Sequence, residues 1–385
     1  MMSPYLKSKI NLYYLICMVA LLFLHDYNYP PYVIVPSTCV TGPFSITNFI
    51  ELFCSNSLLR FRMGLLMAIS GYLMANSKPI PYKDMVLKKV KSLLIPYVVI
   101  SFIGLIITFL FETAYFGWHK PNCTGMIGKS MWLLTWKDYL ILLFKDPVTF
   151  QLWYLKTIFM MALLSPAIRF ILEKIPIQAF AISFVIWMFT NYLDGVTRDR
   201  AFIFYGLGYY LRMYEKDVFV PIPYLRPRYV FVAFLSVCFL RAGLSFSDLS
   251  QTHNLKYLLT ISFKVVELLG CYSVWFCFDR YAKVIIHNKW YLKYGACSFF
   301  VYAFHAPMLN YINQILRWQG IYNYRGSHLL FYFLMPVLIL PLMILLDRQV
   351  KRFFPKSFAL ISGGRGIKNN VVSDTVKPKD SSMLL

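Results

Sequence analysis

A histidine and an aspartate stand side by side where the first long apolar segment of the chain ends. The segment runs from Ile10 to Leu24 and is followed by His25-Asp26. Histidine exchanges a proton near neutral pH, so His25 is a candidate general base. Adjacent residues point to different sides of a helix, so Asp26 can hold the tautomer of the ring only if the helix ends at His25. The alternative is a histidine that only caps the segment at an interface.

Further charged or titratable residues interrupt later apolar segments. In hydrocarbon each costs about 2.5–3.5 kcal/mol, so such a group usually faces a cavity or a partner. They are Arg60, Arg62, Lys156, Lys264, Glu267 and His305. Lys264 and Glu267 are three residues apart, so we expect them to neutralise each other on one helix face. Arg60 and Arg62 are two apart, so we expect at least one to face the interior, unless both reach to the interface.

A cluster of three lysines precedes another apolar segment. Lys88, Lys89 and Lys91 bring together the cations that a phosphate site requires. The alternative is a set of ordinary basic residues at a membrane surface. The sequence contains no G-x-S-x-G, H-E-x-x-H or Walker motif, and its eight cysteines show no paired C-x-x-C spacing, so we expect no metal site.

The composition indicates that these residues are positioned by a membrane-embedded chain. Of 385 residues, 58% are hydrophobic and 15% are charged, against about 45–50% and roughly a quarter in soluble domains. The net charge of +22 comes from short basic clusters between apolar blocks rather than from one solvated face, so we expect no nucleic-acid partner.

The apolar blocks predict an all-α, polytopic membrane helical bundle, because crossing a bilayer takes about 20 mostly apolar residues as helix. We expect a single transmembrane domain over residues 1–361 and a disordered cytoplasmic tail over residues 362–385. The sequence predicts about ten transmembrane helices, at residues 10–24, 58–75, 92–111, 152–172, 177–193, 201–213, 229–244, 256–278, 297–316 and 329–347.

The distribution of Lys and Arg predicts that both termini are cytoplasmic. Segments on the side of the termini carry 25 of these residues and the opposite loops carry 10. The lysine cluster would then lie on the cytoplasmic side and His25 near the outer side. Cys39, Cys54 and Cys123 fall in outer loops, where a disulfide between two of them can persist.

Ordered motifs in this region resemble the integral-membrane acyltransferase family 3, whose members move acyl groups from acyl-coenzyme A to hydroxyls of surface glycans and other acceptors. The resemblance covers roughly residues 10 to 350. Its motifs are a first span ending in His25, Arg60 leading into Ile69-Ser70-Gly71-Tyr72-Leu73, Lys88-Lys89-Val90-Lys91 leading into Ile95-Pro96-Tyr97, Leu152-Trp153-Tyr154-Leu155-Lys156, Tyr205-Gly206-Leu207-Gly208, and Ser298-Phe299-Phe300-Val301-Tyr302-Ala303-Phe304-His305.

The resemblance implies a membrane-bound O-acyltransferase of the cell membrane that moves an acyl group, acetyl in our prediction, from cytoplasmic acyl-CoA. The acceptor would be a hydroxyl of a cell-surface glycan or its lipid-linked precursor. His25 would be the base, Arg60 or Lys156 would stabilise the oxyanion or orient the acceptor, and Lys88, Lys89 and Lys91 would hold the coenzyme. Weaker candidates for lining the site are Asp26, Trp153, Tyr154, Tyr302 and His305.

The sequence departs from the family at Tyr14, where relatives usually carry an arginine, and Lys156 stands where many have arginine. Lysine keeps the charge but loses the bidentate fork. Two other functions therefore stay open: a transporter or flippase of a lipid-linked saccharide, and a catalytically inactive relative. The sequence leaves the acyl group, the acceptor and a homo-oligomeric state undetermined.

Overall fold

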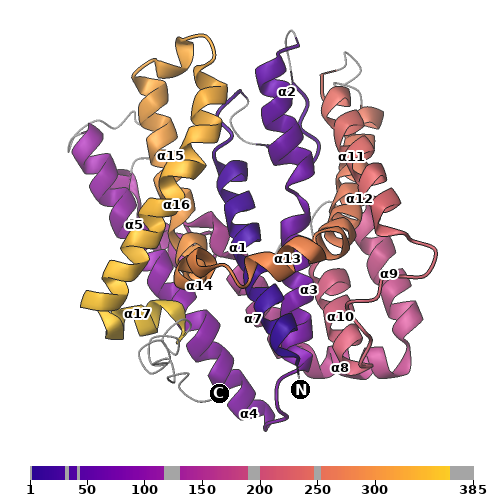
Figure 1. The fold of residues 1–385 in the computed structure, drawn as a ribbon. Helices are drawn as coiled ribbons and strands as arrows, with labels where there is room; N and C mark the ends of the chain where they lie inside the picture. Colours follow the sequence, from indigo (N-terminus) through magenta and orange to yellow (C-terminus); the bar gives the residue numbers. More distant parts are fainter. Residues whose placement is uncertain are drawn as a thin grey trace, which may run out of the picture.

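The computed structural model describes residues 2–30, 34–40, 44–116, 131–189, 200–246 and 253–364, and these contain helices and loops but no β-strand. The all-α prediction is therefore confirmed. The helices form one bundle (Figure 1), in which the N-terminal helix α1 crosses the centre. Their bounds are α1 Pro4–His25, α2 Ile46–Leu52, η1 Phe53–Leu58, α3 Phe61–Ala75, α4 Tyr82–Lys89, η2 Val90–Leu94, α5 Ile95–Phe116, η3 Met131–Leu133, α6 Trp136–Phe144, η4 Phe150–Leu152, α7 Trp153–Leu163, α8 Ser165–Lys174, α9 Pro176–Phe189, α10 Arg200–Met213, α11 Pro227–Leu244, α12 His253–Cys277, α13 Asp279–Ile285, α14 Lys289–Tyr294, η6 Gly295–Cys297, α15 Ser298–Trp318, η7 Ile321–Asn323, α16 Ser327–Phe353 and α17 Pro355–Ser362.

Every predicted apolar block contains a helix, but fewer are both long and apolar enough to cross a bilayer. Among the described residues six segments meet that test, and a seventh does if α7 and α8 count as one span. The six are Pro4–His25, Ile46–Ala75, Tyr82–Ala114, Pro227–Leu244, Asn254–Cys277 and Ser327–Phe353. The count of about ten stays a prediction.

The block predicted over residues 152–172 is bent rather than straight. The axes of its two halves differ by 61° at the junction after Leu163. The first turn of α8 holds Pro166, which has no N–H to donate to the preceding turn. This bend ends α7 two turns after Tyr154, one of the candidate site residues.

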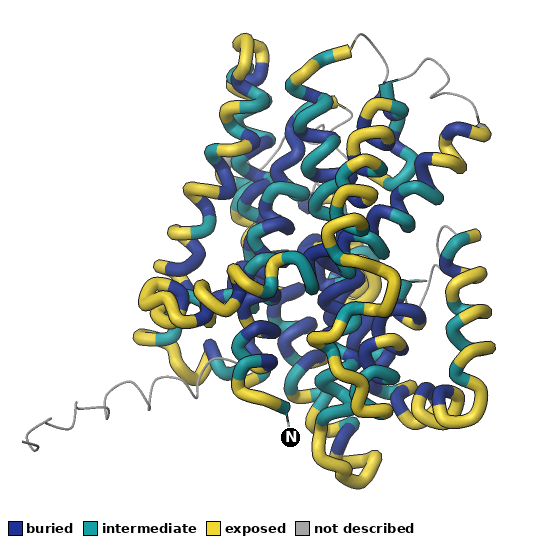
Figure 2. Tube along the Cα trace, turned by 45° about the vertical axis from the view of Figure 1, so that its right-hand side comes forward, coloured by how far each residue is buried: buried dark blue, intermediate teal, exposed yellow. Residues whose placement is uncertain are grey.

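The outer surface of the bundle is apolar, as a lipid-facing surface must be. Large exposed side chains include Phe184 on α9, Val232 on α11 and Leu338 on α16. Figure 2 shows exposed residues along the outer helices and buried residues inside. In water such extended apolar surface would favour aggregation, whereas lipid tails cover it at no cost.

Two glycines allow α3 and α10 to approach closely. A Cβ atom on Gly71 would lie 2.0 Å from the carbonyl oxygen of Tyr205, and one on Gly208 would lie 1.8 Å from that of Ala68. No side chain fits at either position, so the backbones of the two helices touch. Small residues commonly permit such contacts between membrane helices.

The two described ends of the chain lie toward the same end of the bundle. Figure 1 places the N-terminus near α4. The end of α17 also reaches this region, since a Cβ on Gly363 would lie 2.6 Å from the carbonyl oxygen of Ser92 in η2. We call it the terminal end. Which side of the membrane it faces stays a prediction, and the predicted tail lies outside the described residues from residue 365 onward.

An ion pair ties α1 to the short helix α13, which lies outside the six candidate spans. Lys9 is 1% exposed, and its ammonium group lies 2.7 Å from Asp279. Partial burial would raise the pKa of Asp279, but hydrogen bonds from Lys9, Tyr5 and Lys283 outweigh it and lower the pKa to about 2. The carboxylate is therefore ionised at any physiological pH.

Candidate functional site

His25 is the last residue of α1, and its ring meets two other rings. The centroid of His305 on α15 lies 5.2 Å away, and that of Phe150 in η4 lies 4.8 Å away in an edge-to-face arrangement. His25 is half-buried. The helix thus ends at His25, as the sequence reasoning required, and brings the candidate base beside a second histidine.

The tautomer of His305 is set by its own helix. Its Nδ1 lies 2.8 Å from the carbonyl oxygen of Val301 and 3.1 Å from that of Tyr302. Since both are acceptors, Nδ1 must carry the proton and donate it. Nε2 then holds the lone pair, and it is buried without a hydrogen-bond partner among the described residues. His305 therefore presents a buried acceptor in the neighbourhood of His25.

A proline and a glutamine hold this turn of α15 in place. Pro307 has no N–H, so the carbonyl of Ala303 four residues earlier loses its helical donor. The side chain of Gln151 replaces it with a bond of 2.9 Å, while the Tyr302 hydroxyl donates to the Gln151 carbonyl at 2.7 Å. These bonds fix η4 against α15, which orders Phe150 against His25.

Asp26 bonds to α15 rather than to the histidine beside it. It is fully buried, and its Oδ1 accepts a bond of 2.9 Å from the side-chain amide of Asn313. Tyr322 in turn donates to Asn313 at 2.5 Å. Among the described residues no hydrogen bond joins Asp26 to the His25 ring. Asp26 thus fixes the end of α1 on α15, and His305 occupies the neighbourhood in which we expected the carboxylate to act.

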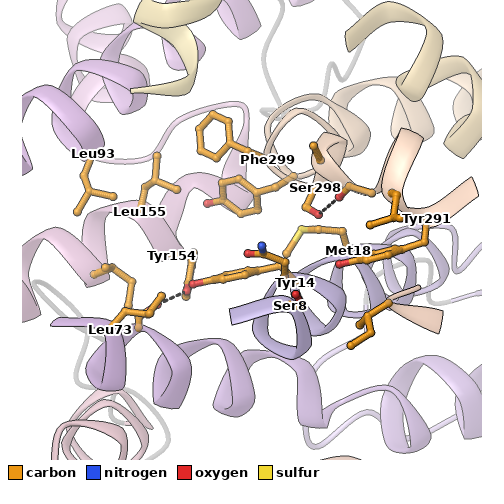
Figure 3. A pocket seen from close by; sticks show the side chains of 18 residues that line it. Ser8, Tyr14, Met18, Leu73, Leu93, Tyr154, Leu155, Tyr291, Ser298 and Phe299 are labelled. Carbon is orange, nitrogen blue, oxygen red and sulfur yellow. Dashed lines mark hydrogen bonds between the residues drawn. The ribbon is translucent and has the colours of Figure 1, made fainter. Parts of the chain in front are cut away.

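A cavity of about 590 Å³ lies inside the bundle, toward the terminal end. Figure 3 shows Tyr14, Tyr154 and Tyr291 around it. Its walls come from α1, α3, η2, α7, α14, η6 and α15 and combine apolar side chains with hydroxyl groups. The lining residues are Ser8, Asn11, Tyr14, Met18, Ser70, Leu73, Leu93, Tyr154, Leu155, Ile158, Ile286, Tyr291, Leu292, Gly295, Ala296, Ser298, Phe299 and Tyr302.

The cavity and His25 share one face of α1. Asn11, Tyr14 and Met18 line the cavity at helical spacing, and His25 follows Met18 by two turns, which places it on the same face about 10 Å further along. On α15, Tyr302 lines the cavity and His305 lies one turn beyond it. Two neighbouring helices therefore lead from the cavity to the histidine pair.

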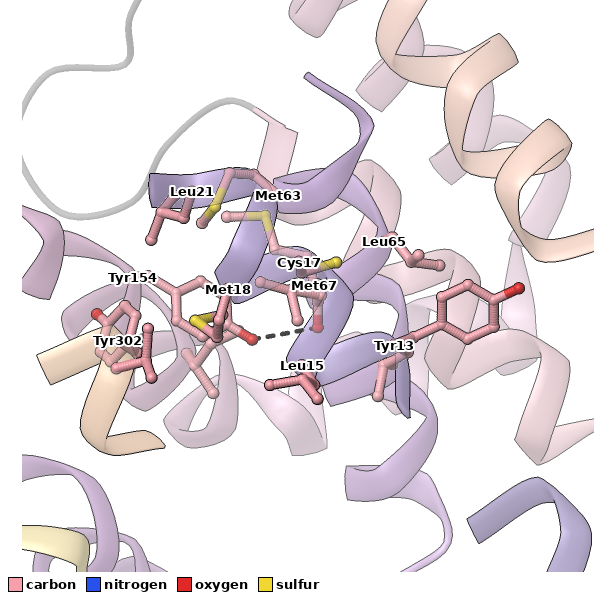
Figure 4. Close-up of a cluster of buried hydrophobic side chains, with 14 of the residues drawn as sticks. Tyr13, Leu15, Cys17, Met18, Leu21, Met63, Leu65, Met67, Tyr154 and Tyr302 are labelled. Atoms are coloured by element: carbon pink, nitrogen blue, oxygen red, sulfur yellow. Dashed lines mark hydrogen bonds between the residues drawn. The ribbon is translucent and has the colours of Figure 1, made fainter. Parts of the chain in front are cut away.

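Tyr154 connects this cavity to the close contact between α3 and α10. Its hydroxyl lies 2.8 Å from that of Ser70, next to Gly71, and 3.2 Å from the carbonyl oxygen of Leu66. It packs in the buried apolar cluster of α1, α3 and α7 (Figure 4). Trp153 is half-buried, with its ring 6.3 Å from that of Tyr154, and is not one of the cavity-lining residues.

Tyr14 stands at a position that matters for the family resemblance. Tyr14 lines the cavity, so a tyrosine in place of an arginine changes the wall of the cavity itself. The position at which the family resemblance predicts an arginine thus presents a neutral hydroxyl-bearing ring to the cavity.

The two predicted catalytic cations, Arg60 and Lys156, lie on different helices, α3 and α7. On α7, Tyr154, Leu155 and Ile158 line the cavity, and at about 100° per residue Lys156 projects away from it. Arg60 caps α3 two residues after η1, whose Ser55 donates to the carbonyl of Phe23 two residues before His25. The segment that leads to Arg60 is therefore joined to the end of α1.

The three predicted coenzyme-binding lysines lie at the terminal end. Lys88 and Lys91 are exposed and Lys89 is half-buried, where α4 continues into the π-helical turn η2. Leu93 in the same turn lines the cavity, two residues after Lys91. None of the three lysines is among the residues that line the cavity, but Lys89 precedes Leu93 by about one turn and so lies on the same side of the helix.

Sequence reasoning missed two arginines that share the surroundings of Arg60. Arg200 begins α10, and Arg241 lies in the last turn of α11. Both guanidinium groups lie 5.5 Å from the ring centroid of Phe263. Arg200 lies one residue before a predicted span, whereas Arg241 lies inside the span predicted over residues 229–244 and could have been identified as a charge within an apolar segment. The ion pair recorded for Glu267 is with Arg200 at 3.1 Å, while Lys264 donates to the carbonyls of Trp187 and Met188.

Two of the three cysteines predicted in outer loops lie among the described residues. Cys39 and Cys54 are both thiols, so they do not form a disulfide with each other, and Cys123 lies outside the described residues. Among the residues with described side chains, no group of three or more His, Cys, Asp or Glu is arranged to hold a metal ion.

Comparisons with known proteins identify the family. The family model described as an acyltransferase domain, of acyltransferase family 3, matches residues 15–348. The succinoglycan biosynthesis protein ExoH of Rhizobium meliloti (strain 1021) is 20% identical over 377 residues, which cover 94% of each chain. No solved structure matches. The chain therefore belongs to the acyltransferase family 3 and is a multi-pass membrane acyltransferase.

Proposed function

We propose that the protein transfers an acyl group, acetyl in the simplest case, from cytoplasmic acyl-CoA to a hydroxyl of a cell-surface glycan or its lipid-linked precursor. One observation carries the proposal: the face of α1 that lines a cavity leads on to the histidine pair, and the turn that follows the predicted coenzyme-binding lysines contributes Leu93 to the wall of that cavity. The relative named for succinoglycan biosynthesis supports a glycan acceptor.

The dimensions suit an acyl-CoA donor. The extended pantetheine arm is about 15–20 Å long. Tyr14, in the wall of the cavity, precedes His25 by eleven residues, or about 16 Å of helix. With the nucleotide phosphates at Lys88, Lys89 and Lys91, the arm would occupy the cavity and present the thioester near His25. Clustered ammonium groups attract phosphate without demanding one geometry.

The histidine pair would supply the proton chemistry. His25 takes the proton of the acceptor hydroxyl as its oxygen attacks the thioester carbonyl. The tetrahedral intermediate collapses, the C–S bond breaks, and the coenzyme thiolate leaves with the proton returned by His25. His305 acts as a positioning residue, because its Nε2 is an acceptor suited to the second N–H of His25. Arg60 would orient the acceptor or stabilise the oxyanion.

Turnover by purified protein tests this proposal. Full-length protein in lipid nanodiscs should release free CoA from acetyl-CoA when a glycan acceptor is present. His25→Ala should fold and lose at least about a hundredfold in kcat, the usual contribution of general base catalysis. His287→Ala, which changes an exposed histidine after α13, is the matched control and should keep full activity. Full activity in His25→Ala would remove this residue from the mechanism.

A further inference from the structure

Three guanidinium groups lie around the ring of Phe263, and a fourth arginine, Arg62, follows Arg60 by two residues. The groups of Arg60, Arg200 and Arg241 lie 5.2, 5.5 and 5.5 Å from the ring centroid. Arg62, two residues after Arg60, is 1% exposed. We call these four residues the arginine cluster. It joins the start of α3, the start of α10 and the end of α11 around α12.

The members of the cluster differ in how fully they are bonded. Arg241 donates to the carbonyls of Leu259, Asn56 and Pro36 and to the hydroxyl of Ser57, so its role is explained by structure alone. Arg60 donates to the side chain of Asn56 and Arg62 to the carbonyl of Leu59. The Nε atoms of Arg60 and Arg62 are buried without a hydrogen-bond partner among the described residues.

Among the described residues, no ion pair neutralises Arg60 or Arg62. Four arginines carry a formal charge of about +4, since guanidinium groups stay protonated in proteins. The ion pair recorded within the cluster is between Glu267 and Arg200. Like charges repel strongly in a medium of low dielectric constant, and stacking on an aromatic ring offsets only part of that repulsion. An anion would stabilise the cluster.

The cluster is also accessible and close to the reacting groups. Arg60 is half-buried and the side chain of Arg200 is 15% exposed, so solvent reaches two of its members. Arg60 and Arg62 follow η1 in the chain. The segment that leads to them, η1, is fixed to the end of α1 by a bond of 2.9 Å from Ser55 to the carbonyl of Phe23.

We propose that Arg60 and Arg62, supported by Arg200, bind a carboxylate or phosphate group of a substrate whose reacting atoms lie at His25. The planar fork of arginine matches both anions in geometry. The identity of the substrate rests on the proposed function, whereas anion binding itself does not. The anion belongs either to the acceptor or to a second carboxyl group on the transferred acyl group.

Binding of inorganic pyrophosphate tests the site without turnover. The melting temperature of purified full-length protein in detergent should rise saturably with pyrophosphate, because a ligand of the folded state stabilises it. Arg60→Gln and Arg62→Gln should lose this rise. Arg169→Gln is the matched control, since this exposed arginine pairs with Glu173 on α8 and should leave the rise intact. No rise in the wild type, or an equal rise in both cluster variants, would overturn the proposal.

A second variant keeps the test decisive if the glutamine variants unfold. Arg60→Lys keeps the positive charge but not the fork, so it should fold and bind pyrophosphate at least about tenfold more weakly. Unchanged affinity in a folded Arg60→Lys protein would contradict recognition by the Arg60 guanidinium. Loss of acyl transfer with intact pyrophosphate binding would count against the proposed function and not against this site.

Competition by acyl donors separates the two sources of the anion. If pyrophosphate is displaced by succinyl-CoA but not by acetyl-CoA, the cluster binds a carboxylate on the acyl group. If neither donor displaces it, the cluster serves the acceptor. Displacement by both donors would place the phosphates of CoA in the cluster and refute its assignment to the reacting groups.

Discussion

The close contact between α3 and α10 makes Gly208→Ala a sharp test of the fold. The new Cβ would lie 1.8 Å from the carbonyl oxygen of Ala68, and real Cβ atoms essentially never come within 3.0 Å of another heavy atom. The two helices must therefore separate by at least about 1.2 Å at this point. The obstructing atom belongs to the backbone, so no side-chain rotation relieves the clash.

The cost follows from the rigidity of both partners. Overpacking a core by a methyl group usually costs about 1–3 kcal/mol. Because a backbone atom is displaced, we expect Gly208→Ala to reach the upper end, about 3 kcal/mol, or roughly a hundredfold in the folding equilibrium. Ser70 would move with α3, and its bond to Tyr154 would be strained. The cavity changes shape, so the KM for acyl-CoA should rise as well.

The matched control lies on the same helix. A Cβ on Gly206 would meet only Phe180, at an ordinary 3.8 Å. Replacing a helical glycine by alanine without a clash should stabilise the protein by about 0.5–1 kcal/mol. We would compare the thermal unfolding of Gly206→Ala, Gly208→Ala and wild type in one detergent, and acyl transfer in nanodiscs. If the two variants melt at the same temperature, the close approach of α3 and α10 is refuted.

Three further predictions concern other parts of the molecule. Asp279→Asn should lower the free energy of unfolding by about 1–3 kcal/mol, because it leaves Lys9 buried without its carboxylate. In the wild type, the pKa of Asp279 is lowered to about 2, so the stabilisation by its ion pair is present above about pH 4 and is lost as the pH falls through about 2. Acid unfolding monitored by tryptophan fluorescence should therefore differ between the wild type and Asp279→Asn mainly above pH 4. Lys88→Glu together with Lys91→Glu should raise the KM for acyl-CoA with kcat nearly unchanged, and the increase should shrink at high salt; a salt-independent effect would contradict an electrostatic role. His305→Ala should lower kcat by at least about tenfold at unchanged KM for acyl-CoA and change the pH profile of kcat; equal profiles would reduce His305 to a packing residue.

Local patterns in the sequence predicted the helices because apolar length is a local property. Every predicted apolar block contains a helix, and α1 ends at His25 as its apolar run does. The resemblance also identified the family correctly. The bend between α7 and α8 was not predicted, although Pro166 is in the sequence, because a proline near a helix start is compatible with either a new helix or a kink.

The sequence could not predict which polar groups meet, since that depends on contacts between distant helices. It gave no indication that Arg200, 67 residues away in the chain, is a partner of Glu267. From the sequence, Arg60 and Lys156 were equal candidates for stabilising the oxyanion or orienting the acceptor. The structure distinguishes these two candidates, because Lys156 projects away from the cavity.

The sequence by itself determined the membrane setting, the family and the candidate base. These follow from composition, apolar run length and ordered motifs, which are read along the chain. The tertiary structure decided what surrounds the base. The ring of His305 lies beside the ring of His25, while the carboxylate of Asp26 bonds to Asn313. A cavity lies along the same face of α1, and an arginine cluster forms around Phe263. The physical reason is that a helix fixes the direction of each side chain, but only packing decides which side chain of another helix lies opposite.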